Sequence, residues 1–163
     1  DGNFIHCSGT GVGGGTILGL SKLLLGTTDP IEIARLAKEG NESSVDLILE
    51  DVVSGPIGKL PSDTTAVNFG KLSKLDSEIS KQDIAAGIVN LVGQTAARIA
   101  TSVATTFNAK EIVVVGRSPS FIGLKNSLEQ AASIMGFSPH FPKNGEYASA
   151  LGALLVAEKN PSD

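Results

Sequence analysis

The stretch GTGVGGGT, residues 9–16, decides the fold class, because five of its first seven residues are glycine. Strand-like residues 3–7 precede it, and the apolar helical pattern of residues 17–25 follows it directly. Glycine lets the backbone approach a ligand closely, and a helix start presents unpaired N–H groups with a partial positive charge. This order predicts a strand, a phosphate-binding loop and a helix at a nucleotide site. A tight turn whose glycines only relieve crowding remains the other interpretation.

Two better-known glycine motifs fit this stretch less well. A P-loop ends in Gly-Lys-Ser/Thr, and the chain has no lysine before Lys22, which excludes that motif. A dinucleotide fingerprint is present within residues 9–14, but it requires a second strand after the helix. Here Asp29 has the position of an N-cap and Pro30 that of the first residue of another helix. Dinucleotide binding therefore stays a distant alternative.

Composition limits the class of protein. The chain has 163 residues, 41% of them hydrophobic and 18% charged, enough for one good core or two small ones. A net charge of −4 without a basic cluster argues against a nucleic-acid partner. A single cysteine and no signal-peptide pattern favour a reducing cytoplasm. Polar residues interrupt the apolar stretch 88–107, so we expect a buried helix there and no membrane span.

Further along the chain, hydrophobic periodicity predicts alternating helices and strands. Residues 30–39 and 45–53 have helical spacing, and a glycine- and proline-marked loop at 54–63 separates the two halves. Ser80 and Asp83 form a start signal for a long helix that extends to about Asn108. Its apolar residues cover more than one stripe, which favours burial in a core and in a subunit interface.

The last third predicts a strand, a helix, a short strand and a final helix. The β-branched run 111–116 is typical of a central strand buried on both faces of a parallel sheet. We expect a helix from 118–120 to about 135, a strand at 137–141 and a last helix at 146–157. The order is α/β. Because ligands bind beyond the carboxyl ends of such strands, the turns at 9–16, 116–120 and 144–150 are expected to converge on one ligand.

Five segments in register carry a resemblance to a known family. They are residues 8–16, 19–20, 68–70, 112–116 and 144–154. Over nearly its whole length the chain resembles the C-terminal part of the type II pantothenate kinases, the fumble family of eukaryotic and some bacterial enzymes. The resemblance implies an α/β fold, namely a ribonuclease-H-like lobe of the actin-like (hexokinase/Hsp70 superfamily) ATPase fold. Residues 1–163 would be the C-terminal nucleotide-binding lobe, with the N-terminal lobe absent from this chain.

The activity that the resemblance implies is transfer of the ATP γ-phosphoryl group to the primary hydroxyl of pantothenate. The product is 4'-phosphopantothenate, and the reaction is the first step of coenzyme A synthesis. Mg²⁺ would arrive with ATP and be held by phosphates and waters, and no metal ligand is assigned in this chain. A homodimer would form through the helix at Ser80–Asn108.

The resemblance also assigns binding residues. The second phosphate-binding loop would consist of Gly13, Gly14, Gly15 and Thr16. The residues near the adenosine would be Gly116, Arg117 and Ser118. Thr10 and His6 would contact the substrate, although the family usually has an arginine at the position of His6. A neutral histidine lacks the charged fork that binds a carboxylate, and a strand histidine satisfied by hydrogen bonds is an equal interpretation.

No catalytic residue is assigned, because the family's general-base glutamate and first phosphate loop lie upstream of this chain. The lobe alone is therefore expected to be inactive. The acids Asp29, Asp46, Asp51 and Glu146 are interpreted as helix caps or solvated surface.

Cys7 is expected to be a small buried hydrophobe and His140 to be structural, with no zinc-ligand spacing. Two other functions stay open. One is a catalytically inactive homologue that binds nucleotide or acyl-CoA as a regulatory module, and the other is a sugar or acetate kinase relative.

Overall fold

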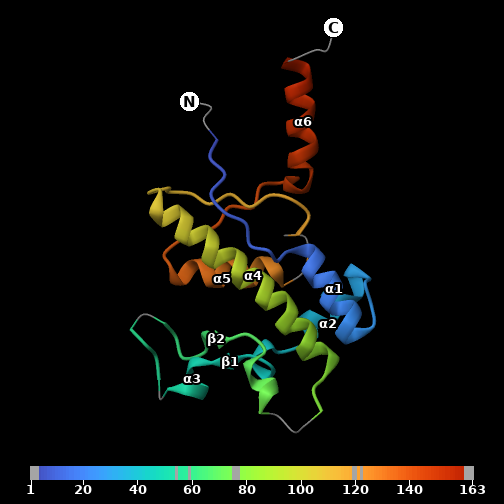
Figure 1. Cartoon of the computed structure of the whole chain (residues 1–163), viewed down its shortest axis with the longest axis vertical. Helices are drawn as coiled ribbons and strands as arrows, with labels where there is room; N and C mark the ends of the chain where they lie inside the picture. The colour runs from blue at the N-terminus through green and yellow to red at the C-terminus, as the bar shows by residue number, and fades with distance from the viewer. Residues whose placement is uncertain are drawn as a thin grey trace.

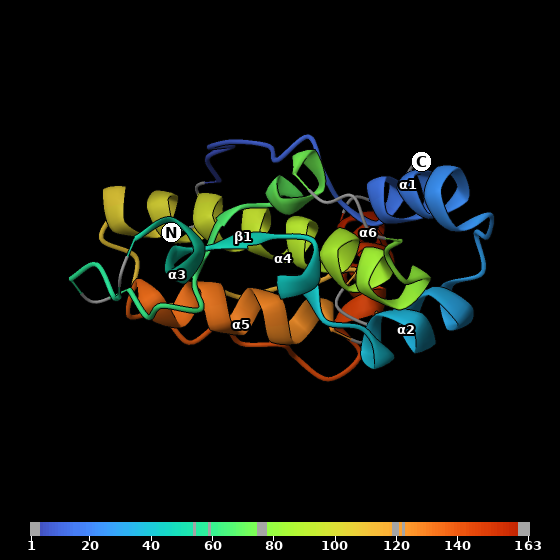
Figure 2. The same ribbon diagram turned by 90° about the horizontal axis from the view of Figure 1, so that it is seen from below.

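One long central helix, α4 (Lys81–Thr106), organises the computed structural model of this chain (Figure 1). The structure describes residues 4–53, 55–58, 60–74, 78–118, 121 and 123–159. Helix α5 (Leu124–Ile134) lies along one side of α4, and α1 (Gly14–Leu25) and α2 (Pro30–Glu39) pack near its N-terminal half (Figure 2). The remaining elements are η1 (Glu42–Ser44), β1 (Leu47–Ile48), α3 (Leu49–Val52), β2 (Thr65–Val67), η2 (Gly70–Ser73), η4 (Gly145–Tyr147) and α6 (Ala148–Lys159).

The hydrophobic core forms around α4. Its main cluster joins Ile88 and Val89 of α4 to Ile17 of α1 and Ile33 of α2, and all four side chains are almost fully buried. A second cluster joins Ala97 of α4 to α5. Each large side chain buried in this way contributes about 1.5–3 kcal/mol of transfer free energy. The broad apolar surface of α4 is therefore covered within this chain, on more sides than a single stripe could cover.

Two predicted helix starts are confirmed, at Asp29 and Ser80. Asp29 caps α2 by accepting a hydrogen bond from the Ile31 N–H at 2.9 Å, with Pro30 as the first helical residue. Ser80 caps α4 by accepting from the Asp83 N–H at 3.0 Å. The Asp83 carboxylate does not return to Ser80 but accepts from the Asn41 N–H at 2.7 Å, which ties the segment after α2 to the start of α4. The helix expected from 118–120 begins only at Leu124, as α5 with Gly123 as its N-cap, and residues 119–120 lie outside the described residues.

The helix predicted at 45–53 is wrong in its extent. Residues 47–48 form strand β1, which pairs antiparallel with β2, and only residues 49–52 are helical. The strand pairing prevents a longer helix here. The Leu49 and Glu50 N–H groups donate to the Thr64 and Ser62 carbonyls rather than to carbonyls of a preceding helical turn. The apolar spacing there suits a short strand and a single helical turn equally well, so periodicity could not separate them.

The strands predicted at 3–7, 111–116 and 137–141 do not form as regular strands. Residues 4–8 have no regular secondary structure, and the other two segments meet in one parallel bridge, Val113 with His140. Val113 and Val115 are about half exposed, contrary to the expected two-sided burial. A strand needs hydrogen-bonding neighbours on its edges, and within the described residues this segment has one on a single side. Cys7 is exposed, so its expected burial is also wrong.

The described elements are a mixture of helices and short strands, consistent with the α/β class. The final helix α6 forms close to the predicted range and projects away from the other helices (Figure 1). None of its residues is buried. Among the helices of the described residues, none combines the length and the apolar character needed to cross a bilayer.

Gly93 and Gly19 offer a matched test of the packing around α4. A Cβ at Gly93 would lie 2.6 Å from the Ser127 Cβ of α5, whereas one at Gly19 of α1 would meet nothing within 4 Å. We expect Gly93→Ala to destabilise the fold by about 1–3 kcal/mol, because overpacking outweighs the gain in helix propensity. Gly19→Ala should stabilise it by up to about 1 kcal/mol. Urea midpoints measure both, and equal shifts in one direction would contradict the close helix contact.

Candidate functional site

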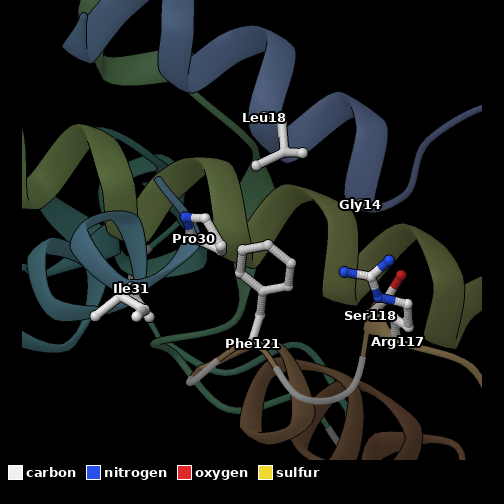
Figure 3. A pocket seen from close by; sticks show the side chains of 8 residues that line it. Gly14, Leu18, Pro30, Ile31, Arg117, Ser118 and Phe121 are labelled. Carbon is white, nitrogen blue, oxygen red and sulfur yellow. The ribbon is translucent and has the colours of Figure 1, made fainter. Parts of the chain in front are cut away.

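One pocket lies where the start of α1 meets the loop before α5 and is lined by residues of both. Its volume is about 530 Å³, and its lining comes from α1, α2 and three residues before α5 (Figure 3). The lining residues are Gly14, Leu18, Pro30, Ile31, Ala34, Arg117, Ser118 and Phe121. Three of them, Gly14, Arg117 and Ser118, are predicted nucleotide-binding residues that lie about a hundred positions apart in the sequence. The structure brings them together.

The glycine loop folds into an open helix start rather than a closed hairpin. The Gly13 N–H donates to the Thr16 hydroxyl at 3.1 Å, and the Gly13 carbonyl accepts the first helical bond from the Ile17 N–H. Gly11 has a φ of 66°, a conformation that favours glycine. Helix α1 has no acidic residue in its first turn, so the partial positive charge of its start is not neutralised locally.

Gly14 of α1 lies close to the loop at 117–118. A Cβ at this position would lie 3.3 Å from the Ser118 hydroxyl. A larger side chain would therefore fill the space that separates the start of α1 from the loop at 117–118. Arg117 and Ser118 lie beside Gly14 in the close-up view (Figure 3). A positive helix end, a guanidinium and a hydroxyl together form the polar half of the pocket, suited to an anion.

The apolar half of the pocket was not foreseen from the sequence. The Phe121 ring lies between Pro30 on one side and Arg117 on the other, with Leu18 opposite (Figure 3). In the sequence, Leu18 and Ile31 are recognisable only as members of helical patterns. Their shared role depends on how α1 crosses α2, which a local pattern does not encode. A slot with an anion-binding end and an apolar wall suits a ligand that combines phosphate with a flat ring.

The third predicted turn, at 144–150, contacts the turn that begins at Gly116. The Gly116 N–H donates to the Gly145 carbonyl at 2.9 Å, so the turns at 116–118 and 144–146 are in direct contact. Gly116 lines a smaller pocket of about 180 Å³ with Lys125, Phe141 and Glu146. The Lys125 ammonium lies 5.0 Å from the centre of the Phe141 ring. The three turns are therefore neighbours, although they line two pockets and not one.

The two predicted substrate residues do not line either of these pockets. His6 is exposed on the segment that leads to the glycine loop. The Thr10 hydroxyl is engaged within the loop, where it accepts from the Val12 N–H and donates to the Val12 carbonyl. Gly13, Gly15 and Thr16 lie around the start of α1 beside the larger pocket. The ligand roles of all these residues stay predictions.

Asp29 and Asp51 serve structural roles, as expected, and Asp29 is the N-cap of α2. Asp51 pairs with Lys71 at 2.8 Å and accepts from the Ile48 N–H at 2.9 Å, and both partners lower the pKa of its carboxyl. Glu146 is exposed in η4. Among the described residues no group of three or more His, Cys, Asp or Glu is placed to hold a metal ion.

Asp46 is the exception to the expectation of solvated surface, because it is fully buried. Its carboxylate accepts from the Phe69 N–H at 2.7 Å, the Asn90 amide at 2.9 Å and the Asn68 amide at 3.1 Å. Burial raises the pKa of this carboxyl, and the hydrogen bonds only partly oppose that effect. Phe69 has a φ of 57°, an uncommon conformation for an aromatic residue. Asp46 thus holds the Asn68-Phe69-Gly70 turn in place.

Further polar side chains of α4 extend the hydrogen-bond network around Asp46. Gln94 donates to the Thr65 hydroxyl at 2.9 Å, and Arg98 donates to the Thr65 carbonyl at 3.1 Å. Together with Asn90 they lie four residues apart on one helix face and attach β2 to α4. These are the same polar residues that interrupt the apolar stretch in the sequence.

An open helix start beside an apolar slot is an arrangement found in phosphate- and nucleotide-binding α/β proteins. Comparison with known proteins makes the assignment specific. The model of the Fumble family matches residues 1–156, and the chain belongs to that family.

Curated relatives carry the name type II pantothenate kinase. The chain is 34% identical over 160 residues to the one from Bacillus anthracis and 33% identical over 160 residues to one from Bacillus cereus, and each match covers 98% of this chain. The protein from Staphylococcus epidermidis is 33% identical over 150 residues, covering 91% of this chain. The chain spans 57–58% of the length of these relatives. The predicted family membership is confirmed.

The raised pKa of Asp46 gives a test of the buried network. Above its ordinary pKa of 3.8 the folded state keeps the proton more readily than the unfolded state, so this group's contribution to stability falls as pH rises towards the folded-state pKa. The slope is at most about 1.4 kcal/mol per pH unit. We expect Asp46→Asn to lose this component, and the exposed Asp63→Asn control to keep it. Unfolding free energies measured across acid pH test this expectation. Parallel pH profiles for the native protein and both variants would contradict the raised pKa of Asp46.

Proposed function

We propose that this chain supplies the nucleotide-binding part of an enzyme that phosphorylates pantothenate with ATP. The observation that carries the proposal is the pocket in which the start of α1, Arg117, Ser118 and an apolar wall meet. Family membership and relatives named type II pantothenate kinase support the choice of reaction. The product would be 4'-phosphopantothenate, at the entry to coenzyme A synthesis in the cytoplasm.

In this proposal the pocket binds ATP through two complementary halves. The N–H groups at Gly14, Gly15 and Thr16 face the phosphates from the start of α1, where a helix favours negative charge. Arg117 and Ser118 add a cation and a hydroxyl donor to the same end. The Phe121 ring and the neighbouring apolar side chains accept the flat base.

The reaction transfers the γ-phosphoryl group to the primary hydroxyl of pantothenate. The bond between the γ-phosphorus and the β,γ-bridging oxygen breaks, ADP leaves with that oxygen, and the hydroxyl proton passes to a base. Such a transfer depends on positioning and on neutralising developing charge. The described residues place no carboxylate in the larger pocket, so they fit the phosphates and not a magnesium ion. Mg²⁺ would accompany ATP on its phosphate oxygens.

The proposed architecture is a two-lobed kinase with the actin-like ATPase fold, of which this chain is the C-terminal, ribonuclease-H-like lobe. The share of the relatives that the chain spans, 58%, supports a further lobe. The half-exposed segment 111–116 supports it too, since its β-branched run is typical of a strand buried on both faces. A base for the hydroxyl proton would belong to the other lobe.

We also propose a homodimer in which two copies of α4 contribute. After its intrachain contacts, α4 keeps a half-buried stripe of Leu91, Thr95, Ile99 and Val103 at four-residue spacing. Such a stripe on a helix that is otherwise covered suits a second copy of the same helix.

The competing function is a regulatory module that binds nucleotide or acyl-CoA without turnover. An exposed histidine at position 6, where the family usually has arginine, is the observation in its favour. Both functions require nucleotide binding, so turnover separates them. The natural gene product, at whatever length it has, should phosphorylate pantothenate with ATP, and binding without turnover would favour the regulatory module.

Gly14→Val tests the pocket itself. A branched side chain at Gly14 would meet the Ser118 hydroxyl and fill the space between α1 and the loop at 117–118. We expect ATP affinity to fall about tenfold or more, a loss of about 1.4 kcal/mol or more. Gly19→Val makes the same change in the same helix at a position open to solvent and should leave affinity nearly unchanged. Isothermal titration calorimetry measures both, and equal affinities would exclude this pocket as the ATP site.

Ile99→Glu tests the dimer. A charge in the centre of the α4 stripe would be buried in the dimer without a partner, which favours the monomer. Light scattering should show about half the native mass for this variant if the native protein is dimeric through α4. The exposed Ser102→Glu control lies one turn along the helix and should keep the native mass. An unchanged mass for Ile99→Glu would place the interface elsewhere.

A further inference from the structure

The apolar end of the larger pocket has no polar side chain among the described lining residues. Its members are Leu18, Pro30, Ile31, Ala34 and Phe121. We call these five residues the apolar wall. Figure 3 shows the Phe121 ring in the middle of the pocket, with Arg117 and Ser118 to one side of it and Pro30 and Ile31 to the other. A base that extends from the phosphate end would therefore pass over the Phe121 ring and reach the rest of the apolar wall.

The main-chain donors that α1 and α2 bring to the apolar wall are already used. Pro30 has no N–H, and the Ile31 N–H donates to the Asp29 carboxylate at 2.9 Å. Leu18 lies in the interior of α1 and Ala34 in the interior of α2, where main-chain N–H and C=O groups bond to the adjacent turns. These four residues therefore present carbon atoms, and no unused N–H group, to a base at the apolar wall.

The main chain of Phe121 is engaged in the same way. Its N–H donates to the Ser118 carbonyl at 3.1 Å, and its carbonyl accepts from the Leu124 N–H at 3.2 Å. The Phe121 ring is left to contact a ligand through its face. Ile31, at the other end of the apolar wall, is 79% exposed. The polar edge of a bound base can therefore stay in water, where it needs no partner in the protein, while the ring packs on Phe121.

The described apolar wall can recognise the shape of a base but not its polar edge. Adenine and guanine share a flat two-ring shape and differ in the donors and acceptors at their edges. A site that hydrogen-bonds a polar group of its substrate rejects an analogue without that group by a factor of about 10⁴–10⁵, whereas an apolar pocket discriminates by about a hundredfold or less. Stacking on an aromatic side chain tolerates different bases, because each base has a π-face. The apolar wall is a site of the second kind.

We infer that this pocket selects a purine nucleoside triphosphate by its phosphates and its ring shape, without regard to which purine it carries, and that Phe121 determines this preference. The inference rests on the proposed nucleotide site and extends it to the class of substrate. The start of α1, Arg117 and Ser118 would contact the same triphosphate in ATP and in GTP. Either nucleotide should therefore bind and serve as the phosphoryl donor.

Isothermal titration calorimetry of the natural gene product with ATP and with GTP tests the preference. We expect the two dissociation constants to agree within about tenfold, and kcat/KM for pantothenate phosphorylation with the two donors to agree equally well. A larger preference for either purine would overturn the inference and leave the proposed function standing. Equal binding of both nucleotides without turnover would contradict only the proposed function, and binding of neither would contradict both.

Phe121→Ala tests the stacking surface. Removal of the ring should weaken the binding of ATP and of GTP by the same factor, about fivefold to a hundredfold, and should leave the affinity for inorganic tripolyphosphate unchanged. Phe107→Ala, at a phenylalanine that is 56% exposed at the end of α4, is the matched control and should change none of the three affinities. A loss confined to one purine, or an equal loss for tripolyphosphate, would overturn the inference.

Discussion

The close packing of α4 against its neighbours is the constraint on which the rest of the structure depends. Gly93 allows α5 to approach, since a Cβ there would lie 2.6 Å from the Ser127 side chain. Gly87 allows Val45 and Phe69 to approach, since a Cβ there would lie 2.5 Å and 3.1 Å from their side chains. Both α1 and the residue that begins α5 are anchored on α4 through the same core cluster. The pocket exists because α1 and the start of α5, which are distant in sequence, are both fixed to α4. The pocket opens in the space between these two segments.

The polar side of α4 explains why this helix is not uniformly apolar. Asn90, Gln94 and Arg98 appear in the sequence as interruptions that argue against a membrane span. In the fold they form a ladder that satisfies Thr65 and, through Asn90, the buried Asp46. A buried carboxylate is costly unless it is hydrogen-bonded, and here three donors surround it. The network gives the β1–β2 hairpin a definite position on a helix that otherwise offers only apolar contacts.

Local signals in the sequence predicted the helices well and the sheet badly. The caps at Asp29 and Ser80 were correct because an N-cap depends on neighbours within three residues. The run at 111–116 was predicted to be a central strand, and it forms only one bridge, since strand formation depends on partners elsewhere. Glycine spacing before a helix indicated a candidate phosphate loop, and the family resemblance assigned its residues, an assignment that stays a prediction. The place of Phe121 and Ile31 in the pocket could not be predicted. These residues become neighbours only through the way α1 and α2 cross the loop before α5.

The left-handed backbone of Phe69 has a consequence for how the protein moves. A non-glycine residue in this region costs about 1–3 kcal/mol and persists only where several contacts hold it. Here those contacts are the Asp46 carboxylate, which accepts from its N–H, and the glycine surface of α4 at Gly87. Loss of any one lets the turn relax and removes support from the others. The Asp46 carboxylate, the Phe69 turn and the α4 surface at Gly87 therefore depend on one another, and they are expected to lose their contacts together in a local opening.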